Sequence, residues 1–275
     1  MDPADFLSVA GILAASGAFA GFLAGLLGIG GGVIFVPVLY FVLVSVFEVL
    51  PENAIVVATA TSLGCMIPTS TVSCLSHYRA RNMDTGLIRR WSPWLILGVL
   101  LGSLFSSRFG GLWLSALFGC VLLLSSANTL LRAKAPPLRN ELPSRPWQAL
   151  MAMFISGFSV MLGIGGGTLS VPLLTLFGMD PRKAIGTAAA IGLFIAVPGA
   201  VGMLLAGGAV ADPSLPPFTY GRVCLLAVLC IVPFSMLLAV LGARVNRMLD
   251  PVLLKRIFCV LLILTGLKML ANALM

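Results

Sequence analysis

The chain has 275 residues, of which 59% are hydrophobic and only 9% are charged, with a formal net charge of +8. Soluble domains carry about 25% charged residues, so this composition excludes a protein that faces water on all sides. The basic residues are scattered between apolar runs without interleaved aromatics, which excludes a nucleic-acid partner. Several runs exceed the roughly 20 apolar residues that cross a bilayer. The sequence therefore predicts an all-α, polytopic protein of the lipid bilayer.

Ten apolar runs, bounded by charges, Pro and Gly, predict about eight to ten transmembrane or re-entrant helices. In chain order they are residues 6–27, 33–47, 54–76, 93–107, 112–131, 147–162, 168–178, 184–208, 222–242 and 253–273. One long polar stretch interrupts them. We therefore divide the chain into a first transmembrane repeat (1–131), a cytoplasmic linker (132–146) and a second transmembrane repeat (147–275).

The two halves share a motif that carries most of the information in the sequence. LLGIGGGVIFVPVL at 26–39 and MLGIGGGTLSVPLL at 161–174 are identical at nine of fourteen positions. Residues 60–62 and 186–188 show a weaker sequence similarity at a different offset. Each motif places four glycines within five positions, which breaks a helix. Internal duplication with broken helices is typical of secondary transporters.

The distribution of Lys and Arg predicts how the two halves are oriented in the membrane. If each glycine-broken pair of runs is a hairpin that enters and leaves on one side, fourteen of the seventeen basic residues lie on one face. If each pair crosses once as a broken helix, the basic residues divide ten to seven. The positive-inside rule favours the hairpins. We therefore expect inverted repeats, with both termini outside.

Irregular backbone inside a membrane survives only where protein buries it or where it lines a polar cavity. We expect a short helix to start after each glycine run, near residues 35 and 170, with Pro37 and Pro172 in its first turn. Helix N-termini offer free N–H groups and a partial positive charge, which favour anions. The predicted anion site consists of two glycine runs and nearby hydroxyls: Gly28, Gly30, Gly31, Gly32, Gly163, Gly165, Gly166, Gly167, Thr61, Ser62, Thr168, Ser170 and Thr187.

Other chemistry is sparse. No apolar run carries an acid, Lys or Arg near its middle, and no nucleophile–base pair or metal cluster is visible, so we expect neither enzyme activity nor a metal or cofactor. Gly17, Gly21 and Gly25 form a face for close helix packing. For the GIGGG runs, the alternative to a ligand site is that they allow close helix packing or form a plain hinge. His77, beside Arg79, is either a gate on the anion path or an interfacial histidine with no second role.

These motifs resemble those of the TauE/SafE family of membrane proteins, also called the sulfite exporter or TSUP family. The resemblance lies in GLLGIGGGVIFVPVL at 25–39, its copy at 162–174, ATATSL at 58–63 with Pro68 and His77, and IGTAAAIG at 185–192. It implies an inner-membrane transporter of small anions such as sulfite, thiosulfate or organosulfonates, often in the direction of export. The second half departs from the first, since Ala188 replaces Ser62 and no histidine corresponds to His77.

The sequence thus predicts a secondary transporter, an exporter of a small oxyanion such as sulfite or an organosulfonate. Alternating access would occur around the two GIGGG runs, coupled to a proton or sodium ion. The expected location is the bacterial inner membrane. The alternatives are a transporter or channel for another small anion, a carboxylate or small sulfur species, and a non-transport membrane scaffold subunit.

Overall fold

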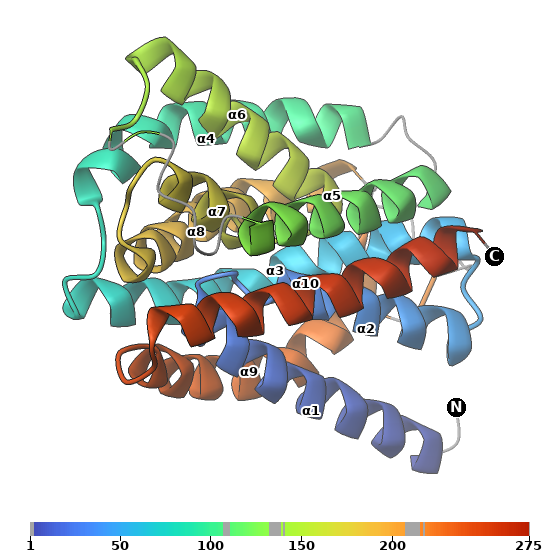
Figure 1. Ribbon diagram of the computed structural model, residues 1–275. Helices are drawn as coiled ribbons and strands as arrows, with labels where there is room; N and C mark the ends of the chain where they lie inside the picture. The colour runs from blue at the N-terminus through green and yellow to red at the C-terminus, as the bar shows by residue number, and fades with distance from the viewer. Residues whose placement is uncertain are drawn as a thin grey trace.

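A computed structural model of the chain describes residues 3–106, 111–131, 139, 141–206, 215–216 and 218–274. The first half contains α1 (Pro3–Leu27), α2 (Gly32–Ser45), α3 (Pro51–Arg79), α4 (Thr85–Ser106) and α5 (Gly111–Leu131). The second half contains α6 (Arg145–Leu162), α7 (Gly167–Leu176), α8 (Pro181–Ala206), β1 (Thr219–Tyr220), β2 (Val223–Cys224), α9 (Leu225–Asn246) and α10 (Pro251–Leu274). The helices lie side by side in one bundle (Figure 1).

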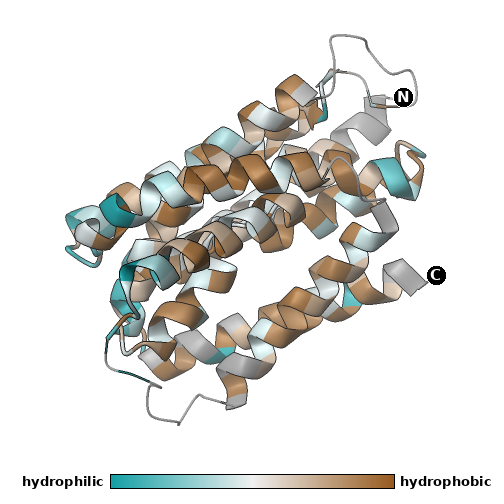
Figure 2. Ribbon diagram, turned by 90° about the horizontal axis from the view of Figure 1, so that it is seen from above, coloured by the Kyte–Doolittle hydropathy of each residue, from teal (hydrophilic) through white to brown (hydrophobic). Residues whose placement is uncertain are grey.

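The predicted all-α polytopic class is confirmed. Each of the ten apolar runs falls on its own helix, although the ends of runs 93–107 and 184–208, and most of linker 132–146, lie outside the described residues. By length and composition, four helices in the described part can cross a membrane: Ser8–Leu27, Pro51–Arg79, Pro181–Leu205 and Leu225–Asn246. Figure 2 shows hydrophobic residues along the bundle and hydrophilic ones mainly at the end away from the termini.

Two details differ from the sequence expectation. Helix α4 begins at Thr85 instead of near residue 93, because Arg89 and Arg90 end the apolar run but are exposed on the helix and do not break it. The short antiparallel pair β1–β2 turns at Gly221, whose φ of +58° suits glycine.

The glycine-broken pairs are hairpins. Figure 1 shows α1 running into the bundle and α2 returning to the end at which α1 begins. Helices α6 and α7 do the same from the opposite end, and α10 finishes at the end where α1 starts. This is the arrangement that the basic-residue count predicted for inverted repeats.

The packing of helices repeats between the halves. Helix α1 packs on α9 and its counterpart α6 packs on α4, while α3 pairs with α8 and α5 with α10. Exchanging every helix for its counterpart in the other half therefore turns the α1–α9 contact into the α6–α4 contact and leaves the α3–α8 and α5–α10 contacts unchanged. An approximate two-fold axis between two repeats produces this pattern.

Close glycine packing joins α1 to α9, as predicted for Gly17, Gly21 and Gly25. A Cβ atom built on Gly17 would lie 2.6 Å from the carbonyl oxygen of Ile231, and one on Gly21 would collide with the backbone of Ser235. The backbones approach this closely only because these positions lack side chains.

We expect Gly21→Leu to lower the melting temperature of the purified protein, because α1 must move away from α9. Overpacking a close contact costs about 1–3 kcal/mol of unfolding free energy. Gly11→Leu on the same helix is the matched control, since a Cβ atom there meets nothing within 4 Å. Equal melting temperatures for the two variants would contradict this assignment.

Candidate anion site at the glycine loops

The two glycine runs form short loops that meet inside the bundle. Loop 1 (residues 28–31) joins α1 to α2, and loop 2 (residues 163–166) joins α6 to α7. The loops begin alike, because Gly28 and Gly163 have φ values of +67° and +62° and end their helices in the left-handed conformation. A Cβ atom on Gly30 would lie 3.4 Å from the Cα of its counterpart, Gly165. Equivalent positions of the two repeats therefore meet at the approximate two-fold axis.

The remaining loop contacts are reciprocal. A Cβ atom on Gly32 would lie 2.8 Å from the Cα of Ile164, and one on Gly167 would lie 2.6 Å from the Cα of Ile29. Both distances are shorter than van der Waals contact. The structure thus brings the two predicted glycine runs together, backbone against backbone, with no room for side chains at these positions.

Both helix starts leave backbone donors without partners. In α2, the N–H groups of Ile34 and Phe35 donate to the Gly31 carbonyl, each over 3.0 Å. In α7, the Ser170 N–H donates to Gly166 over 2.9 Å. Among the described residues, the N–H groups that precede these, at Gly31, Gly32, Gly166 and Gly167, donate no backbone hydrogen bond. These are the orphan donors that every helix N-terminus carries.

The predicted placement of Pro37 and Pro172 in a first helical turn is wrong. Helices α2 and α7 begin at Gly32 and Gly167, so each proline is the sixth residue of its helix. An interior proline has no N–H for the carbonyl four residues earlier. In α7 that carbonyl belongs to Thr168, and the Ser125 hydroxyl of α5 donates to it over 2.8 Å. This hydrogen bond replaces the one that Pro172 cannot make.

Three of the predicted hydroxyls lie at loop 2. The Ser62 hydroxyl donates to the Gly163 carbonyl over 2.8 Å and so ties α3 to the loop. Thr168 stands in the first turn of α7, and the Ser170 hydroxyl donates to the Gly166 carbonyl. Thr61 is used elsewhere, because its hydroxyl accepts the backbone N–H of Cys224 over 2.9 Å.

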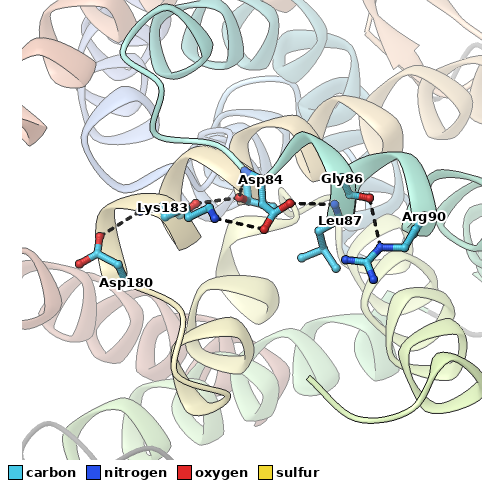
Figure 3. A network of polar contacts seen from close by, with 7 residues as sticks. Asp84, Gly86, Leu87, Arg90, Asp180 and Lys183 are labelled. Carbon is cyan, nitrogen blue, oxygen red and sulfur yellow. Dashed lines mark hydrogen bonds and ion pairs between the residues drawn. The ribbon is translucent and has the colours of Figure 1, made fainter. Parts of the chain in front are cut away.

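The hydroxyl of Thr187 belongs to a polar network at the start of α8, in which Figure 3 shows Asp84 and Lys183. It accepts the N–H of Asp84 over 3.0 Å, and the Asp84 carboxylate pairs with Lys183 at 3.2 Å. Burial acts to raise the pKa of the Asp84 carboxyl. The hydrogen bond from the Leu87 N–H and the charge of Lys183 outweigh burial and hold that pKa below its ordinary value. The network fastens the α3–α4 connection to α8.

Sequence reasoning missed several hydroxyls around the loops. Seven buried side-chain N or O atoms of the described residues lack a hydrogen-bond partner, and four of them are hydroxyls near the loops, on Thr59, Ser70, Ser159 and Thr168. Of these four, only Thr168 was predicted. A Cβ atom on Gly30 would lie 3.0 Å from the Ser70 Oγ, and the Ser159 carbonyl accepts the N–H of Ile164. Buried polar atoms without partners are rare and need an explanation.

The two sides of the site differ in polarity. The offset that relates residues 60–62 to 186–188 also relates Thr59 to Ile185, and these two residues contact equivalent glycines. A Cβ atom on Gly163 would lie 2.8 Å from the Thr59 Cα, and one on Gly28 would lie 2.9 Å from the Ile185 Cγ2. Helix α3 therefore offers hydroxyls to one loop where α8 offers apolar side chains to the other.

The two residues predicted as a gate separate in the structure. His77 is buried, and its Nε2 lies 3.0 Å from the Gly25 carbonyl oxygen of α1. Arg79, two residues later, is exposed at the end of α3. The histidine fills the space between α1, α3 and α8, where a Cβ atom on Gly186 would lie 3.2 Å from its own Cβ.

A bundle of apolar helices enclosing two re-entrant hairpins defines a multi-pass, all-α membrane protein. Residues 13–269 match the family model described as sulfite exporter TauE/SafE, so the chain belongs to that family and is a membrane transporter of it. The resemblance inferred from the doubled motif is thereby confirmed.

Curated relatives cover nearly the whole chain. A probable membrane transporter protein of Haemophilus influenzae is 30% identical over 92% of this chain and 95% of its own length. YunE of Bacillus subtilis, a probable membrane transporter protein, is 30% identical over 93% and 95%. MJ0441 of Methanocaldococcus jannaschii, named likewise, is 25% identical over 97% of each chain. No solved structure matches the chain significantly.

Proposed function

We propose that this protein is a secondary transporter that exports a small oxyanion, such as sulfite or an organosulfonate, and binds it where loops 1 and 2 meet. One observation carries the proposal. Orphan N–H groups stand at two helix starts that meet inside the bundle, and four buried hydroxyls without partners lie on the segments that contact these loops. Such a set of donors has no protein acceptor and suits the oxygens of an anion.

The chemistry of the site favours reversible binding. Two helix N-termini contribute partial positive charges, and neither loop carries a charged side chain. An unpaired buried hydroxyl costs about 1–3 kcal/mol, and an oxyanion that accepts from it removes that cost. Dipoles and hydroxyls without a full countercharge hold an anion less firmly than a buried arginine would, which suits a carrier.

The loops are fully buried, so transport requires movement. Residues 28–33 and 163–168 are all buried in this conformation. Each re-entrant hairpin packs on a helix of the other half, α1 on α9 and α6 on α4. Rocking of these pairs about the approximate two-fold axis would open the loops to either side in turn. We place the basic end of the bundle in the cytoplasm of a bacterial inner membrane, with both termini outside, and expect a proton or sodium ion to drive export.

The proposal predicts anion-selective stabilisation of the purified protein. Sulfite or sulfoacetate should raise the melting temperature above that in chloride of equal ionic strength, because a ligand of the folded state adds about 2.7 kcal/mol at one hundred times its Kd. Sulfate, thiosulfate, taurine and acetate complete the panel. A shift with acetate alone, or an equal shift with every anion, would contradict an oxyanion or sulfonate site.

A further inference from the structure

A groove runs along the outer face of the bundle between α4 and α6, and its inner end reaches Met161, Leu169 and Leu173, which flank loop 2 along the chain. Its polar end is a hollow of about 250 Å³ whose rim carries Arg90, Trp94 and Arg145. A larger apolar hollow of about 650 Å³ continues between the same helices. Along α4 the lining residues include 90, 94, 98, 101 and 105, a helical spacing that makes one continuous stripe.

We propose that this groove binds one anionic phospholipid, with the phosphate between Arg90 and Arg145 and an acyl chain along α4 and α6. The inference rests on the membrane location of the protein and is independent of the transported anion. Basic pockets at the ends of transmembrane helices suit anionic headgroups.

The two buried polar side chains at the base of the polar end, Trp91 and Gln148, already form hydrogen bonds within the protein. The Trp91 Nε1–H donates to the Gln148 Oε1 over 3.2 Å, and the Gln148 Nε2 donates to the Pro143 carbonyl over 2.8 Å. Both side chains are buried, so these hydrogen bonds fix α4 against α6 at the mouth of the groove. The base of the polar end therefore has only the second Nε2–H of Gln148 left to donate, and binding falls mainly to the two arginines.

The arginines are available to a phosphate. Both are exposed, and neither forms an ion pair with any described residue. Arg90 uses its Nε–H on the Gly86 carbonyl, over 3.2 Å, and its terminal nitrogens form no hydrogen bond with the described residues. Guanidinium groups bind phosphate oxygens through paired hydrogen bonds. Trp94 and Trp147, exposed by 42% and 61%, lie at the same end, where aromatic residues mark the membrane–water boundary.

The apolar part of the groove has the shape of a channel for an acyl chain. Its base is formed where glycines bring the helices together, since a Cβ atom on Gly102 would lie 2.5 Å from the Gly157 carbonyl oxygen. Its sides are exposed apolar side chains, among them Phe105, Leu150 and Phe154. A second copy of the chain is a poorer occupant, because a two-fold axis along the membrane normal would gather four arginines at one interface.

Native mass spectrometry of the full chain in detergent tests this assignment with phosphatidylglycerol and phosphatidylcholine of identical acyl chains. We expect phosphatidylglycerol to be retained preferentially, and Arg90→Gln with Arg145→Gln to weaken its binding about thirtyfold, the factor expected for two arginines at an anionic lipid. The matched control is Arg79→Gln with Arg89→Gln, which removes the same charge at the same end but outside the groove. It should retain the wild-type preference.

Three results would overturn the proposal. The first is an equal loss of phosphatidylglycerol in the groove pair and the control pair. The second is competition by millimolar glycerol phosphate, which would indicate a site for a free phosphate without a lipid tail. The third is a dimeric wild-type protein that becomes monomeric in the Arg90→Gln/Arg145→Gln variant and stays dimeric in the control variant. That result would assign the face to a second copy of the chain.

Discussion

Gly165→Val is expected to abolish transport and to lower the melting temperature of the purified protein. A Cβ atom on Gly165 would collide with the Ile29 carbonyl and lie 3.2 Å from the Gly30 Cα. Both neighbours are backbone and cannot rotate away, so loops 1 and 2 must separate. The cost should exceed the roughly 1–3 kcal/mol of ordinary overpacking.

Thermal unfolding of purified protein and flux into proteoliposomes measure the two effects. Gly11→Val is the control, because it adds the same side chain at an exposed glycine with nothing within 4 Å. Wild-type stability in Gly165→Val would contradict the observed meeting of the loops. Wild-type transport in a stably folded variant would show that the loops are not the site.

Ser70→Ala is expected to separate binding from folding. The Ser70 hydroxyl is buried without a partner beside Gly30, so its removal should leave the free protein as stable or stabilise it by about 1 kcal/mol. A hydrogen bond to a charged group contributes about 1.5–3 kcal/mol, so the variant should bind the anion roughly ten- to a hundredfold more weakly. Melting curves with and without sulfite measure both quantities.

Ser62→Ala is the informative comparison. Its hydroxyl donates to the Gly163 carbonyl, so its removal leaves a buried acceptor unpaired and should destabilise the free protein. The two serines thus have opposite expected effects on stability. An unchanged sulfite affinity in Ser70→Ala would remove this hydroxyl from the proposed site.

Much of the architecture could be predicted because apolar runs, basic residues and a doubled motif are strong signals in a membrane protein. The start of α2 at Gly32 could not be predicted, since glycine has low helix propensity, and the close approach of Ile164 that requires a glycine there comes from the other half of the chain. The same holds for α7 at Gly167. The supporting hydrogen bond from Ser125 to Thr168 joins distant segments and leaves no local trace in the sequence.

The hydroxyls of the candidate site were only partly predictable. Thr61 and Thr187 occupy matching positions of the repeats, yet their hydroxyls bind backbone N–H groups of other segments. Helix α3 carries polar residues on several sides, so composition does not identify the side that faces the loops. Thr59, Ser62 and Ser70 do recur at spacings of three and eight residues, a stripe that helical periodicity could have revealed.

The central claim is that the two glycine loops together form one anion site of a carrier. Charge-movement recording on proteoliposomes tests it most directly, with wild type and Ser70→Ala side by side and sulfite, sulfoacetate, taurine, sulfate, thiosulfate and acetate as substrates. The account predicts currents with sulfite or a sulfonate in the wild type and strongly reduced currents in Ser70→Ala. Currents that are the same for every anion, or that Ser70→Ala leaves unchanged, would contradict it.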